Sequence, residues 1–213
     1  SFNYVAANAS LERAFEHLEV CDGSGNENTR EGSGIGLTTR IQMTRLMGLM
    51  CCLLDRPLEG KPLLETSLEM SDEKGVLMPA DQLPAAIAEE KARQQIHREF
   101  ALIGSANVCS VYDAMEDSLM TEESRLLVMR ECCSAYDQLA RVYLQSGEPL
   151  RGLYCSLRGL NLAEMVGPSE ELAKAYSTYA FVKKSPFYGG LARETAESVG
   201  ALAPVTAFCA MLY

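Results

Sequence analysis

Thiol and imidazole groups are the first side chains in this sequence that could do chemistry. The chain has eight cysteines and only two histidines, His17 and His97. The cysteines are Cys21, Cys51, Cys52, Cys109, Cys132, Cys133, Cys155 and Cys209. No two are spaced as Cys-x-x-Cys, and adjacent pairs project at different angles from a helix, which suits neither metal chelation nor an unstrained disulfide. We therefore expect reduced, metal-free cysteines in the cytoplasm or another reducing compartment, with a secreted disulfide framework and a metal site as the alternatives.

Catalytic and nucleotide-binding patterns are the next possibility. Both histidines fall in charged helical segments, where we expect them to be solvated or to cap helices, and no Ser or Cys has a recognisable base beside it. The glycine-rich stretch REGSGIGL, residues 30–37, lacks the third glycine of a dinucleotide-binding turn and the Lys-Ser/Thr of a P-loop. The sequence thus predicts neither catalytic residues nor a cofactor, so we do not expect this chain to be an enzyme by itself.

Charge and hydropathy limit the kinds of partner that this chain is expected to bind. The net charge of -10 and the pI near 4.8 argue against nucleic acid, because phosphate binding needs a basic patch. No segment has the 18 or so uncharged apolar residues that cross a bilayer; the most apolar one, residues 41–56, contains Arg45. There is no signal peptide and no initiator methionine, and the last residues are apolar. We interpret the chain as a piece of a larger protein or as its ordered part.

Helical periodicity runs through most of the chain, and no segment alternates with period two, so the predicted class is all-α. We expect helices at residues 4–20, 37–54, 85–103, 108–119 and from Thr121 to about Gln145, with a polar loop at 21–36. In the helix at 85–103, Ile96, Phe100 and Ile103 are expected to share the apolar side. The domain prediction is a region of N-terminal helices with a Gly-rich loop (1–56), a Pro-rich connection with one short helix near 63–70 (57–84), and a helical-repeat region (85–213). We expect the first and last to be continuous as one solenoid.

A Gly-Pro-Ser step separates two helical stretches near the C-terminus. Gly167 is expected to be a left-handed C-cap, and Pro168 cannot continue the helix. Ser169 is the expected N-cap of the next helix, where Glu170 and Glu171 complement the positive helix end. The stretch is therefore predicted to be a tight helical hairpin.

Small and aromatic residues recur around this hairpin in a tetratricopeptide-like pattern. Its first-helix positions are Tyr136, Leu139, Ala140 and Tyr143, and its small second-helix positions are Gly152 and Gly159. A poorer copy follows with Tyr176, Tyr179, Ala180, Ala192 and Ala196. Ser156 replaces the usual aromatic residue of the second helix. We predict tetratricopeptide-like hairpins stacked as a short α-solenoid; a generic helical bundle with Ala and Tyr in its core is the alternative.

Residues 135–180 also resemble the C-terminal helical-repeat region of multidomain proteins that join class III adenylate or guanylate cyclase domains to a P-loop ATPase. The matching positions are Leu153, Tyr154, Leu157, Arg158, Leu160, Asn161, Leu162, Ala163, Glu164, Gly167, Pro168, Ser169, Glu171, Leu172 and Ala173. The likeness weakens toward residue 213 and is only suggestive for residues 1–56. The catalytic motifs of such proteins, cyclase aspartates and a GxxxxGK[ST] loop, are not in this sequence. The resemblance thus implies a regulatory or scaffolding region.

Two functions are consistent with these patterns. The first is a non-catalytic interaction scaffold, or an accessory subunit of a larger assembly, that takes a peptide or partner helix in a concave groove. Polar positions bordering the repeat stripes are the candidate partner-binding residues: Arg141, Gln145, Arg151, Arg158 and Asn161. The alternative is the regulatory C-terminal region of a cyclase/ATPase signalling protein whose catalytic domains lie outside this chain.

Overall fold

The computed structural model describes residues 36–73, 78–102 and 122–212, together with Ala6, Ala9, Ser10 and Arg13. These ranges contain eight helices and no strand, so the all-α prediction is confirmed for this part of the chain. The helices expected at 4–20 and 108–119 and the loop expected at 21–36 fall almost wholly outside the described residues. The chain divides into two compact units, residues 1–73 and 74–213, and each is considered by itself.

The first unit contains a pair of helices, α2 (Leu37–Leu53) and α3 (Pro57–Glu69). The two backbones approach closely at a pair of glycines. A Cβ atom added to Gly60 would lie 2.5 Å from the carbonyl oxygen of Gly48, and one added to Gly48 would lie 2.8 Å from Cγ of Leu64. No side chain larger than hydrogen fits at this crossing, so the glycines allow the close packing of α2 on α3.

Helix α3 begins earlier and is longer than the short helix expected near 63–70 within the connection at 57–84, because residues 57–69 are helical and pack on α2. Pro57 is tolerated in the first turn, where its missing N–H would have had no helical acceptor. Pro62 lies inside the helix and deprives the carbonyl of Leu58 of its usual donor. Leu58 is 76% exposed, so water can replace that hydrogen bond. The prolines therefore misled the sequence prediction at two positions where a helix can accommodate them.

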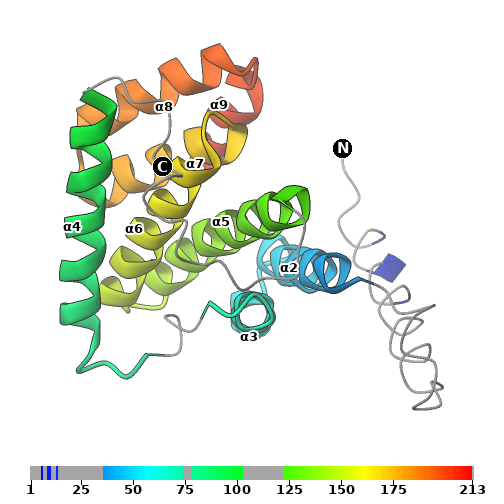
Figure 1. The fold of residues 1–213 in the computed structure, drawn as a ribbon. Coiled ribbons are helices and arrows are strands. Elements are labelled where there is room, and N and C mark those ends of the chain that lie inside the picture. The colour runs from blue at the N-terminus through cyan, green and yellow to red at the C-terminus, as the bar shows by residue number, and fades with distance from the viewer. Residues whose placement is uncertain are drawn as a thin grey trace. The chain divides into compact units, whose positions relative to one another are not determined.

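The second unit contains the remaining described helices, which Figure 1 shows packed side by side. They are α4 (Leu83–Leu102), α5 (Glu122–Gln145), α6 (Pro149–Val166), α7 (Glu170–Lys183), α8 (Pro186–Ser198) and α9 (Leu202–Leu212). Consecutive helices α5 and α6, and then α7 and α8, form antiparallel hairpins. Helix α7 also packs on both α5 and α6, and α9 packs on both α7 and α8. Helix α4 packs along α6.

The α5–α6 hairpin is the best-packed part of this unit. Tyr136, Leu139, Leu157 and Leu160 are fully buried. A Cβ atom on Gly159 would lie 2.9 Å from Cβ of Tyr136. The second-helix glycine thus lies where α6 meets α5, as the sequence pattern predicted.

The turn between α6 and α7 agrees with the predicted hairpin, with one difference. Ser169 is the N-cap of α7, and its hydroxyl oxygen accepts a hydrogen bond from the Leu172 N–H at 3.2 Å. Glu170 and Glu171 occupy the first turn of α7, as expected. Gly167 has φ +88° and ψ -168°, which is an extended, glycine-only conformation and not the left-handed helical one expected. The chain therefore needs a glycine here for a different backbone geometry.

We expect Ser169→Ala to lower the free energy of unfolding by about 1 kcal/mol, because it leaves the N–H of Leu172 without its acceptor. Ser185, the N-cap of α8, makes no capping hydrogen bond through its side chain, so Ser185→Ala is the matched control with a smaller expected effect. Urea midpoints of the two variants would measure the difference. Equal losses would show that the Ser169 cap contributes nothing specific.

Candidate functional site

A buried polar stripe on α4 is the most unusual feature of the second unit. Over residues 83–99 of α4, the part whose side chains are described, the buried residues are Leu83, Ile87, Glu90, Gln94 and His97, spaced alternately by four and three positions. This is the heptad spacing of a helix that packs along another helix. We call these five residues the α4 seam. Three of the five are polar, so the seam differs from an ordinary apolar packing stripe.

The α4 seam shows that this helix buries a different face from the one that its apolar residues predicted. Ile96, predicted to face the core, is 41% exposed. His97, predicted to be solvated or to cap a helix, is 3% exposed. The partner helix α6 explains both differences, because it presents Asn161 and Glu164 to α4 in place of an apolar surface.

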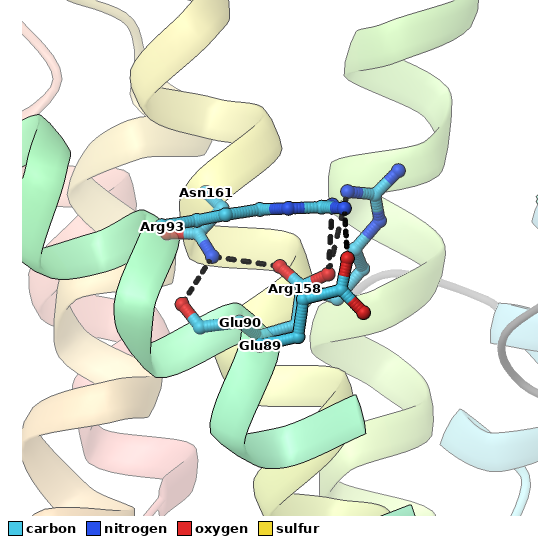
Figure 2. A network of polar contacts seen from close by, with 5 residues as sticks. All are labelled: Glu89, Glu90, Arg93, Arg158 and Asn161. Carbon is cyan, nitrogen blue, oxygen red and sulfur yellow. Dashed lines mark hydrogen bonds and ion pairs between the residues drawn. The ribbon is translucent and has the colours of Figure 1, made fainter. Parts of the chain in front are cut away.

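Glu90 is the centre of the first polar cluster, shown in Figure 2, and only 4% of this residue is exposed. Asn161 Nδ2 donates to Glu90 Oε2 at 2.7 Å and to the backbone oxygen of Glu90 at 2.9 Å. Arg158 Nη1 lies 3.5 Å, and Arg93 Nη1 3.0 Å, from Glu90 Oε1. One buried carboxylate is thus held by an amide and two guanidinium groups, which offsets the cost of removing its charge from water.

Arg93 extends this cluster to the exposed side of α4. Its Nη2 donates to Glu89 Oε1 at 2.7 Å, and the Glu89 side chain is largely exposed. In Figure 2, Glu89, Glu90 and Arg93 come from α4, whereas Arg158 and Asn161 come from α6. The guanidinium groups therefore approach Glu90 from both helices.

Glu164 is the centre of the second cluster. Its Oε2 accepts a hydrogen bond from Gln94 Nε2 at 2.7 Å and lies 2.7 Å from His97 Nδ1. Its Oε1 accepts a hydrogen bond from the Tyr176 hydroxyl of α7 at 3.0 Å. The Tyr188 hydroxyl of α8 donates to Gln94 Oε1 at 3.3 Å. Burial raises the pKa of Tyr176 well above its ordinary value, and the neighbouring charge of Glu164 raises it further. This cluster joins α4, α6, α7 and α8.

Apart from the ion pairs of Arg93 within α4, the contacts of the two clusters link one helix of the chain to another, so these side chains hold α4 against α6 and join α7 and α8 to the same cluster. Arg98, farther along α4, adds a cation–π contact, with its guanidinium carbon 5.0 Å from the ring centroid of Phe187 on α8. Among the described residues, no group of three or more His, Cys, Asp or Glu is arranged to hold a metal ion. The six cysteines within the described ranges are thiols, and Cys209 Sγ donates to Ser177 Oγ at 3.2 Å.

The predicted partner-binding residues fall into two places. Arg158 and Asn161 face α4, and Asn161 is only 1% exposed. The other three lie near the turn between α5 and α6. Arg141 contacts Gln138, Gln145 is exposed at the end of α5, and Arg151 is 3.1 Å from Glu148 and 5.8 Å from the ring centroid of Tyr143. In this second group Gln145 is exposed and Arg141 and Arg151 are half-buried, whereas α4 covers Asn161.

A buried carboxyl between α5 and α7 was not singled out from the sequence. Asp137 is 5% exposed, and burial raises its pKa to about 7. The charge of Arg141, the nearby Thr178 hydroxyl and the charge of Lys174 act in the opposite direction, in decreasing order. The feature of the sequence that could have revealed Asp137 is its position directly after Tyr136, among the first-helix residues of the repeat pattern.

Glu90, Gln94, His97 and Glu164 were also missed. The spacing that links the three α4 residues to Leu83 and Ile87 could have revealed them, but charged and amide residues were assumed to face solvent. No protein-family model matches the chain, and no curated protein or solved structure matches it either. In the part of the chain that the structure describes, none of the helices is long and apolar enough to span a bilayer.

Proposed function

We propose that α5–α9 are tetratricopeptide-like hairpins stacked as a short α-solenoid, and that the chain is a non-catalytic interaction scaffold or an accessory subunit of a larger assembly. The observation that carries this proposal is the packing of α7 on both helices of the hairpin before it, repeated by α9 on α7 and α8. In a helical-repeat array each repeat packs on its neighbours, and here the first helix of each new hairpin contacts both helices of the hairpin before it. The glycine of α6 against Tyr136 of α5 supports the same register.

The proposed binding surface lies at the α5–α6 turn and holds Arg141, Gln145 and Arg151. Arginine is enriched among the residues that dominate protein interfaces. A peptide or helix with acidic side chains would suit this surface, and the net charge of -10 disfavours nucleic acid. The proposed compartment is the cytoplasm or another reducing one, which agrees with the thiols of the described cysteines.

We expect the double variant Arg141→Glu/Arg151→Glu to recover its protein partners from a native extract roughly tenfold less than the unchanged chain, since central interface arginines contribute more than about 1 kcal/mol each. Quantitative mass spectrometry of the captured proteins would measure the loss. Arg193→Glu is the control, because Arg193 is exposed on α8 and pairs with Glu197 of its own helix. Equal recovery by all three chains, with equal thermal midpoints, would refute a partner site at this turn.

The second candidate function is the regulatory C-terminal region of a cyclase/ATPase signalling protein, as the resemblance over 135–180 implies. The observation that favours it is where the resembling residues lie: Arg158, Asn161 and Glu164 hold α4. Such contacts give repeats a means to hold or release another segment. Sequencing the full-length transcript tests this candidate, because a cyclase or ATPase domain upstream would support it and a short stand-alone reading frame would refute it.

A further inference from the structure

We draw no further inference here: the strongest candidate, the outward face of α8, where Phe187 is 53% exposed beside Arg98 and Cβ atoms added to Gly189 and Gly190 would meet nothing within 4 Å, is an unpartnered surface patch, and nothing in the structure shows what covers it.

Discussion

Gly159→Leu is expected to lower the free energy of unfolding by about 1–3 kcal/mol or more, the range typical of overpacking in a well-packed core. The first added carbon would lie 2.9 Å from Cβ of Tyr136, a distance that real Cβ atoms do not show. Tyr136 is fully buried, and its Cβ is fixed to the backbone of α5, so it cannot swing aside as the end of a long side chain can. The two helices must therefore separate. Thermal or urea midpoints would measure the loss.

Gly159→Ala should also destabilise, although less, because the same first carbon is already too close. Gly190 is the matched control, since it lies within α8 and a Cβ there would meet nothing within 4 Å. At such an open helical position, Gly190→Ala should stabilise by up to about 1 kcal/mol. Substitutions at Gly159 and at Gly190 are thus expected to change the free energy of unfolding in opposite directions. A raised midpoint for Gly159→Leu would contradict the packing of α6 on α5 and the repeat register built on it.

The helices that could be predicted best from the sequence are those in which the apolar stripe and the capping residues indicate the same helix boundaries. The hairpin of α6 and α7 shows this: an apolar stripe precedes Gly167, and Ser169 caps the second helix. The positions of Tyr136 and Gly159 also predicted the contact of two helices, because only glycine leaves room for the Cβ atom of Tyr136 at this crossing. Local capping residues and tertiary packing favour the same structure in this region, so these helix contacts could be predicted from the sequence alone.

Two parts of the fold could not be predicted in this way. Helix α3 was predicted only as a short helix near 63–70, because Pro57 and Pro62 were interpreted as breaks, although one starts the helix and the other lies next to an exposed turn. The α4 seam was missed because hydropathy places Glu90 and His97 in solvent. The spacing within α4 can indicate which face of the helix is buried, but the polar partners that make this burial tolerable lie about 70 positions away on α6.

Asp137 shows the same dependence on distant partners, and it has a measurable consequence for stability. Its carboxyl is buried between α5 and α7, where Arg141, Thr178 and Lys174 only partly offset the loss of hydration. Burial therefore raises its pKa from the ordinary 3.8 to about 7. The folded chain keeps this proton at pH values where the unfolded chain has released it.

The direction of the pH effect is set by proton binding. Below pH 3.8 both states carry the neutral acid, so the contribution of Asp137 to stability is fully present. Between that pH and about 7 the folded chain binds more protons, so the free energy of unfolding falls as the pH rises. Above about 7 both states are ionised and the loss is complete. At about 1.4 kcal/mol per pKa unit, the total is on the order of 4 kcal/mol.

Asp137→Asn isolates this contribution, because the amide resembles the neutral acid in shape and does not ionise. We expect the variant to match the unchanged chain in urea midpoint below pH 3.8, and to exceed it by a few kcal/mol in the free energy of unfolding at pH 8. Comparing the two chains at each pH cancels the other titrating groups that they share. Arg141→Gln gives an independent check, since removing the charge that lowers the pKa of Asp137 should move the midpoint of the pH-dependent loss to higher pH. A difference between Asp137→Asn and the unchanged chain that stays constant from pH 4.5 to 8 would show that the carboxyl is hydrated in the folded protein, and that α7 does not close over α5 at this position.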